Sequence, residues 1–454
     1  MRTPSVTQAN RALVISTVGN DEPAADRMGS ASYSYHYVCQ SFLPLLRRWG
    51  RVTVSEHDPE TANGAIHLSF RPLDFFRPAA GAPNAAFPFW DFPDVPAYAL
   101  GGNPQNDWVA VANSLDLLLT SSEFTRDAFA RSGVRVPIRV VPVPVRHPLF
   151  ELAAWTPQRR LLDCQAYELS GDGAPRLQAS SRATSVYHRR VRPHLSRRSI
   201  DLASVLARSA RSARAEWRDI TSAALPPHSP LELSGIVYTT VLNPFDQRKN
   251  WEDLLTAFLF ALRDRADATL VVKLVVPPQR AAFGVNRIVR FWRALGIGHQ
   301  CRVVLVSAYL DDAQMLELTA ASTYYLNASR AEGACLPLQD FLAAGRPAVA
   351  PRHSAIADYF DSGSGLVVES HPEPASWPQD PDGRCTTTWH RLVWTSLRDR
   401  IAESYDLATH DRAGYSRLSA NARARMHALA SDEAVWTRLE PALDSIAEKS
   451  RRAL

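Results

Sequence analysis

Two segments in the second half of the 454-residue chain place charged side chains beside small residues, a combination that suits an anionic ligand. The first reads Glu332-Gly-Ala-Cys-Leu-Pro-Leu-Gln-Asp340; it begins in a predicted loop after a strand and runs into a predicted helix. The amides of residues 333–336 are expected to be free at the positive end of that helix, where they suit a phosphate or a sugar hydroxyl. Asp340 lies about one turn into the helix, so its carboxylate and that of Glu332 can face one ligand.

The second segment is the loop around Arg248 and Lys249, between a predicted strand and a predicted helix. Lysine is rare in this chain: Lys249, Lys273 and Lys449 are its three lysines among 51 basic residues. A lysine ammonium is a compact point charge that arginine does not replace at every phosphate contact. Lys249 is therefore a candidate for anion binding, whereas Lys449 is typical of a solvated chain end. Lys273 lies inside an apolar strand, where it either reaches the same site or is structural.

Strands and helices alternate in two long stretches, which indicates two doubly wound α/β domains with parallel sheets. Residues 1–150 start with an apolar strand at 11–17 and a helix over 35–49. Residues 232–394 restart the pattern with a strand at 235–241 and a helix over 250–264. In such sheets ligands bind at the carboxyl ends of the strands, which is where the loops of Glu332 and Lys249 are expected.

Residues 151–231 form an arginine-rich insert in which we expect a linker and no clear strand. Thirteen arginines stand against seven acidic residues over 151–230, a net +6, although the whole chain carries only +5. The insert includes an amphipathic helix within 190–220, for which two interpretations stay open. In the first interpretation the helix lies on an anionic membrane surface, and in the second it packs across the two domains. Residues 395–454 are expected to be helical and to pack back on the domains.

The segment that starts at Glu332 resembles the signature of the retaining glycosyltransferases of family 4, which have the GT-B fold. The family pattern is Glu-Gly-x-Gly-Leu-Pro-x-x-Glu, followed by small residues and Gly-x-Pro, here Gly345-Arg-Pro. The chain departs from it at Cys335, where the pattern has glycine, and at Asp340, where it has glutamate. The resemblance is strong over 235–350 and weak over 1–150. It implies an α/β GT-B fold, with two Rossmann-like domains facing across a cleft.

The resemblance also implies a donor site on the second domain. Lys249 and Arg248 would contact the diphosphate of a nucleotide sugar, Glu332 the sugar and Asp340 the ribose. A leaving diphosphate gains negative charge in the transition state, and fixed cations beside it stabilise that charge. A further arginine of the family has no counterpart, since Leu242-Asn243-Pro244 stands there. The donor residues are then Asn243, Arg248, Lys249, Glu332, Gly333, Ala334, Cys335, Leu336 and Asp340, with Glu332, Lys249 and Asp91 catalytic.

The first domain is expected to bind the acceptor. Gly29 and Ser30 stand where the family has a Gly-Gly loop that touches the donor phosphates. The family's active-site histidine has no convincing counterpart. Trp90 and Asp91 occupy about its position, and they are either functional or a turn packed on its own prolines. His67 and residues 71–74 are other loop candidates, although a histidine in such a place is usually a core residue.

No cofactor or metal is expected beyond the nucleotide sugar, which is a co-substrate. Asp311-Asp312 resembles a metal-binding pair, but its position before a helix favours helix capping. The five cysteines are scattered without a C-x-x-C pair, which indicates reduced thiols and neither a disulfide framework nor a zinc site.

The sequence thus predicts a hexosyltransferase that moves a sugar from a nucleotide diphosphate to a glycan or lipid-linked acceptor with retention, in surface polysaccharide biosynthesis. Two alternatives stay open: a sugar-nucleotide epimerase or phosphorylase of the same fold, and a non-catalytic glycan-binding or scaffold protein. We recognise no signal peptide or spanning segment, so we expect a cytoplasmic protein, with the insert as the candidate contact to the inner face of a membrane. No nucleic-acid partner is expected, because no recognition motif accompanies the arginines.

Overall fold

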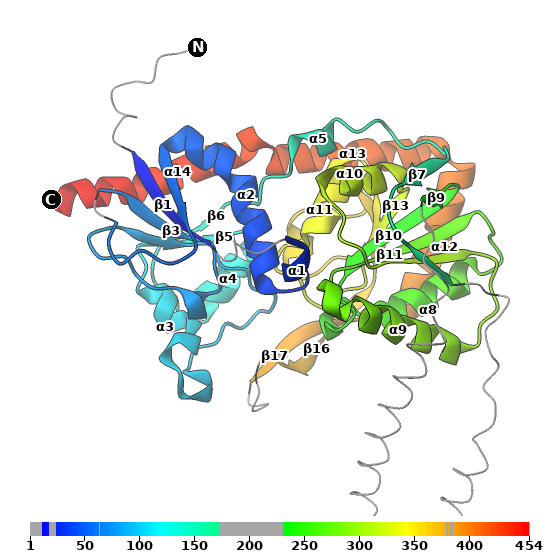
Figure 1. Ribbon diagram of the computed structural model, residues 1–454, viewed down its shortest axis with the longest axis horizontal. Coiled ribbons are helices and arrows are strands. Elements are labelled where there is room, and N and C mark those ends of the chain that lie inside the picture. Colours follow the sequence, from blue (N-terminus) through cyan, green and yellow to red (C-terminus); the bar gives the residue numbers. More distant parts are fainter. Residues whose placement is uncertain are drawn as a thin grey trace, which may run out of the picture.

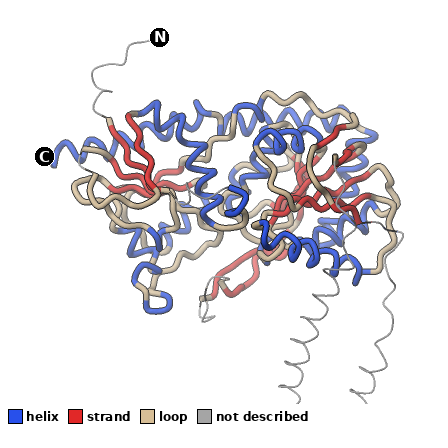
Figure 2. Tube along the Cα trace, viewed as in Figure 1, coloured by secondary structure: helices blue, strands red, loops and turns tan. Residues whose placement is uncertain are grey.

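The computed structural model describes residues 11–17, 24–62, 64–169, 171, 230–377, 380 and 385–453, which form two α/β domains lying side by side (Figure 1). Each domain is built around one sheet with helices packed on it (Figure 2). The amphipathic helix expected within 190–220 lies outside the described residues. Among the described helices, none is both long and apolar enough to cross a membrane.

A six-stranded parallel sheet forms the centre of the first domain. Its third, fourth and fifth strands are fully buried, as expected for a parallel sheet whose two faces are covered. The strand order is β2 (Arg51–Ser55), β1 (Ala12–Ser16), β3 (Ile66–Ser69), β4 (Asn84–Ala86), β5 (Leu117–Thr120) and β6 (Ile138–Val140).

Helix α2 (Ala31–Trp49) supplies much of the first core, with Val38, Phe42 and Leu46 on its buried side. The helix starts four residues before the expected Tyr35, because the Ser30 hydroxyl accepts the amide of Tyr33 at 3.3 Å and caps it. The other helical segments of this domain are α1 (Ala24–Arg27), η2 (Leu73–Phe75), η3 (Leu100–Gly102), η4 (Pro104–Asn106), α3 (Trp108–Asn113), α4 (Glu123–Arg131) and α5 (His147–Phe150).

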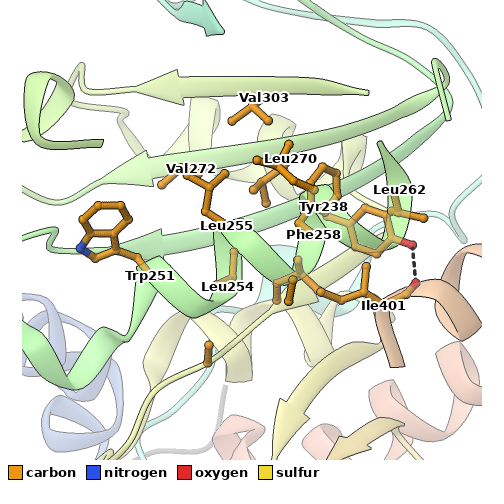
Figure 3. Close-up of a cluster of buried hydrophobic side chains, with 14 of the residues drawn as sticks. Tyr238, Trp251, Leu254, Leu255, Phe258, Leu262, Leu270, Val272, Val303 and Ile401 are labelled. Carbon is orange, nitrogen blue, oxygen red and sulfur yellow. Dashed lines mark hydrogen bonds between the residues drawn. The ribbon is translucent and has the colours of Figure 1, made fainter. Parts of the chain in front are cut away.

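The second domain has a seven-stranded sheet with one antiparallel edge strand. Helix α8 (Trp251–Leu262) packs Leu254 and Phe258 against side chains of the central strands, including Leu270 (Figure 3). The strand order is β15 (Gly365–Val368), β14 (Ala348–Pro351), β13 (Tyr324–Leu326), β10 (Ile236–Leu242), β11 (Ala268–Leu274), β12 (Arg302–Val306) and β8 (Tyr167–Leu169). The remaining helical segments are η8 (Gln247–Lys249), α9 (Pro278–Leu295), α10 (Asp312–Ala321), α11 (Leu336–Ala343) and η9 (Ser354–Asp358).

The prediction that residues 151–231 hold no strand is wrong. Strand β8 joins the second sheet antiparallel to β12, and Glu168 receives two hydrogen bonds from Arg302. Strand β7 (Arg160–Leu162) pairs with β9 (Leu231–Leu233) beside that sheet. These strands are three residues long, and they are stabilised by partners far along the chain, so their own residues give no clear strand signal.

Two C-terminal features tie the domains together. Helices α12 (Trp394–His410) and α13 (Arg412–Ala430) pack on the second domain, and α14 (Asp432–Ala453) crosses back to the first (Figure 1). An antiparallel hairpin of β16 (Ser370–Ser376) and β17 (Thr386–Leu392) extends toward the first domain, where Trp377 packs on Trp90. The helices agree with the prediction for 395–454, whereas the hairpin was not predicted.

Candidate active site

A cleft of about 1630 Å³ lies between the two domains, at the carboxyl ends of the strands of the second sheet. Every residue that the sequence assigned to the donor, the acceptor or catalysis lines this cleft. From the first domain these are Gly29, Ser30, Trp90 and Asp91, and from the second Asn243, Arg248, Lys249, Glu332, Gly333, Ala334, Cys335, Leu336 and Asp340.

Glu332 and Lys249 form an ion pair in the loop regions that follow β13 and β10. The Lys249 ammonium donates to Glu332 Oε1 at 2.6 Å, and Ser329 donates to the same oxygen at 2.6 Å. Burial opposes ionisation of Glu332, but Lys249, Arg248 and these hydrogen bonds outweigh it, so its pKa lies below the usual range. Burial also opposes ionisation of Lys249, and the Glu332 carboxylate outweighs it to raise the lysine pKa. Both members of the pair are therefore charged at neutral pH.

Arg248 connects the two domains. Its guanidinium lies 2.7 Å from Asp91 of the first domain and 2.7 Å from Asp246 of its own loop. The second carboxylate also accepts the Arg248 amide, which fixes the short η8 turn that carries both cations. Burial raises the pKa of Asp91 even though Arg248 opposes the shift.

The Gly333 amide is not free, contrary to the prediction for residues 333–336. It donates to Asp91 Oδ1 at 2.8 Å, and the Gly333 carbonyl accepts the hydroxyl of Ser121 at 3.0 Å. A Cβ atom at this position would lie 2.7 Å from the carbonyl oxygen of Trp90, so the first domain leaves room for glycine alone. Trp90, Asp91 and Ser121 thus belong to the part of the first domain that meets the Glu332 loop.

The turn before α2 meets the second domain in the same way. A Cβ atom at Gly29 would lie 2.6 Å from the carbonyl oxygen of Val275 and 3.3 Å from the Asn243 amide. Gly29 also has a φ of +81°, which glycine adopts without strain. Gly29 and Gly333 therefore both lie where the backbone of one domain closely approaches the backbone of the other.

Cys335 has a left-handed conformation, with φ of 55°, directly before helix α11. The family pattern has glycine here, which this conformation favours. The cysteine side chain is buried, and its sulfur accepts a hydrogen bond from the Asn327 amide at 3.1 Å. Gly345 follows the same helix with φ of +67°, as expected for a helix end.

Asp340 points toward the first domain. The Tyr37 hydroxyl of α2 donates to Asp340 Oδ2 at 3.3 Å, and Arg146 is close enough to oppose the effect of burial. Burial nevertheless raises the Asp340 pKa to about 7. Tyr37 and Arg146 also line the cleft, and sequence reasoning missed both, because neither belongs to a motif.

His67 does not reach the cleft. It is fully buried, it hydrogen-bonds Ser16 and Asn84 at 2.9 Å each, and its ring stacks on Phe76. Arg71 is likewise buried and donates to the Thr17 carbonyl at 2.8 Å. The core interpretation of His67 therefore holds, and of residues 71–74 only Pro72 and Asp74 line the cleft.

Asp311 caps α10, as predicted. Its carboxylate accepts the Gln314 amide at 2.8 Å while the Gln314 side chain accepts the Asp311 amide at 3.0 Å. Over the described ranges, no group of three or more His, Cys, Asp or Glu side chains is placed to hold a metal. The five cysteines are all unpaired.

Comparison with known proteins gives a fold and no sequence family. No family model matches the chain, and no curated protein matches it. Among solved structures, sucrose-phosphate synthase from Thermosynechococcus elongatus has a TM-score of 0.54 and 14% identity, over 96% of this chain and 98% of that chain. HepE from Anabaena, in complex with UDP and glucose, has a TM-score of 0.49 and 12% identity, over 96% and 99% of the two chains.

The likeness to sucrose-phosphate synthase, with two mostly parallel sheets facing across a cleft, identifies the fold as that of the GT-B glycosyltransferases. The predicted fold class is confirmed. At 14% identity the likeness shows the fold alone, and one fold supports many activities, which are determined by the residues of the site.

Proposed function

We propose that the protein is a retaining glycosyltransferase, similar to family 4, which transfers a hexose from a nucleotide-diphosphate sugar to an acceptor hydroxyl. The observation that carries the proposal is the joined cluster of Lys249, Glu332, Arg248 and Asp91 in the cleft between the domains. Two ion pairs of the second domain, Arg248–Asp246 and Lys249–Glu332, meet Asp91 of the first domain here. A purely structural surface network does not require such a connection across the cleft. A buried, charged cluster in a cleft is typical of a functional site.

The cluster fits the charge that develops in glycosyl transfer. The bond between the anomeric carbon and the diphosphate oxygen breaks, and the diphosphate leaves with added negative charge. Lys249 and Arg248 would stabilise that charge, while Glu332 would bind the sugar and Asp340 the ribose. The acceptor oxygen bonds to the anomeric carbon on the face that the diphosphate leaves, and a departing phosphate oxygen takes the hydroxyl proton. This route needs no protein base, no metal and no counterpart of the family's histidine.

We further propose a glycan or lipid-linked acceptor, entering beside Gly29, Ser30, Trp90 and Asp91, and a role in surface polysaccharide biosynthesis. The support for this entry side is that these first-domain residues line the same cleft as Glu332. A cytoplasmic location with peripheral membrane contact through 190–220 belongs to the same proposal. Flotation with anionic liposomes tests that contact: binding that persists after deletion of 172–229 contradicts it.

Activity is tested by screening nucleotide-diphosphate sugars for transfer and for slow hydrolysis. We expect Glu332→Gln and Lys249→Met to lower kcat/KM on the order of 100-fold, as loss of one group that stabilises transition-state charge does. Glu369→Gln is the matched control, because Glu369 is exposed and outside the cleft. Activity that survives both cleft substitutions refutes the site.

Two other outcomes select the alternatives. Release of free sugar phosphate or of an epimer without an acceptor identifies a phosphorylase or an epimerase. Glycan binding with no turnover of any nucleotide sugar identifies a non-catalytic protein. Neither alternative has an observation of its own in the structure that favours it.

A further inference from the structure

Lys273 is a buried cation without an acidic partner in the described part of the chain. It lies on β11, its side chain lines the cleft, and the residue is 3% exposed. Its ammonium donates to the Leu274 carbonyl at 2.8 Å and lies 3.9 Å from the sulfur of Met28. Burial lowers the Lys273 pKa to about 8, and Cys164 offsets only part of that effect. A buried ammonium with so few partners is costly, so its retention needs a reason.

The other two cleft cations at the strand ends are already neutralised. Lys249 is paired with Glu332, and Arg248 with both Asp91 and Asp246. This group of two cations and three carboxylates has a net charge of −1, whereas a diphosphate brings further negative charge to the same place. Binding a diphosphate there therefore requires another cation to balance its charge. Lys273 forms no ion pair with a carboxylate among the described residues.

Lys273 lies next to the segments that were assigned to the diphosphate. It is directly opposite Val241 in the sheet, two residues before Asn243. The Gly29 turn packs over this edge, against Asn243 and against Val275, two residues after Lys273. Met28, which contacts the ammonium, belongs to the same turn.

We propose that Lys273 is a phosphate-binding residue of the cleft, which contacts the diphosphate of the nucleotide beside the Gly29 turn and separately from the Arg248-Lys249 loop. This inference rests on the proposed function, and it assigns a third cation to the donor. It also explains why the chain keeps lysine here. A flexible stem with a small charged end suits a narrow site between a strand and a turn.

The test is nucleotide binding by Lys273→Met, measured by calorimetry with UDP, GDP, ADP, CDP and dTDP and with the matching nucleosides. We expect the diphosphate that binds wild type to bind the variant roughly 10–100-fold more weakly, the worth of one hydrogen bond to a charged group. Affinity for the matching nucleoside stays unchanged. The ligand-free melting temperature stays the same or rises, because an unpaired buried charge has been removed, whereas a structural lysine would lower it. Lys273→Gln repeats the test if the methionine variant does not fold.

Arg346→Met is the control for loss of a buried cation outside the cleft. Arg346 donates to backbone carbonyls, including those of Thr319 and Ala153, so this variant melts earlier but binds diphosphate as wild type does. Diphosphate affinity of Lys273→Met within about twofold of wild type overturns the inference while leaving the proposed function intact. An equal loss of affinity for the nucleoside also overturns it. A wild type that binds none of the five diphosphates overturns the proposed function and, with it, this inference.

Discussion

The Glu332 carboxylate has two donors on one oxygen, Lys249 and Ser329, each at 2.6 Å. Such a pair stabilises the fold only while it is complete, because each buried charge compensates the desolvation of the other. The Glu332 side chain is 5% exposed and that of Lys249 is 20% exposed, so solvent replaces little of the lost attraction. At the residue scale, the site is therefore a coupled unit and not a set of separate charges.

Glu332→Gln is expected to lower the free energy of unfolding by about 2 kcal/mol, because it leaves the Lys249 ammonium nearly buried without its counter-charge. Adding Lys249→Met to it should restore part of this loss. Denaturant unfolding of both single variants and the double variant measures the coupling. Strictly additive losses would show that the two side chains do not stabilise each other.

Asp340 makes stability depend on pH. Its pKa is raised from 3.8 to about 7 by burial, so the folded state holds the proton more tightly than the unfolded state. That contribution is complete below the unfolded pKa and is lost as pH rises through about 7. Asp340→Asn keeps a side-chain oxygen that accepts the Tyr37 hydroxyl, and because asparagine does not titrate, the variant does not lose this stability as pH rises. We expect the variant to gain about 2–3 kcal/mol of stability relative to wild type between about pH 5 and pH 8.

Melting temperatures at the two pH values measure this difference. Asp399→Asn, at an exposed residue paired with Arg398, serves as the control and should show no such trend. A difference in melting temperature between Asp340→Asn and wild type that is the same at both pH values contradicts the prediction.

At the scale of elements, α11 begins from a strained residue. Cys335 has φ of 55°, a conformation that a β-branched side chain adopts with difficulty. Cys335→Gly removes the strain but also the buried sulfur, so we expect it to unfold near wild type. Cys335→Val should cost at least about 1–2 kcal/mol more than the glycine variant. Thermal unfolding of the two variants checks this, and equal stability would show that the conformation carries no strain.

The interface between the domains depends on glycine. At Gly29 a methyl group would meet the Val275 carbonyl of the other domain at 2.6 Å. We expect Gly29→Ala to separate the domains and to increase the radius of gyration measured by small-angle X-ray scattering. Gly64→Ala is a matched control, since Gly64 has a similar φ of +73° and open space around it. Equal effects of the two substitutions would assign the change to backbone strain and not to the interface.

At the scale of the whole molecule, the last helix, α14, returns to the first domain and packs in its core. Leu443 of α14 is fully buried in the first core, and Asp444 accepts the indole N–H of Trp49 at 2.9 Å. Leu443→Ala is therefore expected to cost about 2–5 kcal/mol and to raise amide hydrogen exchange in β1 and α2, although these lie at the opposite end of the sequence. Leu161→Ala is the control, because Leu161 is 56% exposed. Faster exchange confined to α14 would mean that the helix is not part of the first core.

Local pattern predicted the regular elements well where they are long. The helix expected over 250–264 is observed as α8, Trp251–Leu262, and the Asp311 cap is confirmed. The short strands β7 and β8 and the hairpin β16–β17 were missed. Strands β7 and β8 pair with strands far along the chain, so the local pattern contains little of what stabilises them.

The sequence by itself determined which residues follow the carboxyl ends of the strands, and therefore which loops face the cleft, because strand and helix periodicity is a local property. Only the tertiary structure decided how those residues are paired. Asp91 and Gly333 are 242 residues apart, and Lys249 and Glu332 are 83 apart. The contact of Asp91 with Gly333 depends on the packing of the two domains, and that of Lys249 with Glu332 on the pairing of β10 with β13 inside the second sheet. The same tertiary structure leaves Lys273, among the described residues, as a buried cation without a carboxylate. Charge, burial and close approach are properties of that packing, and no spacing along the chain specifies them.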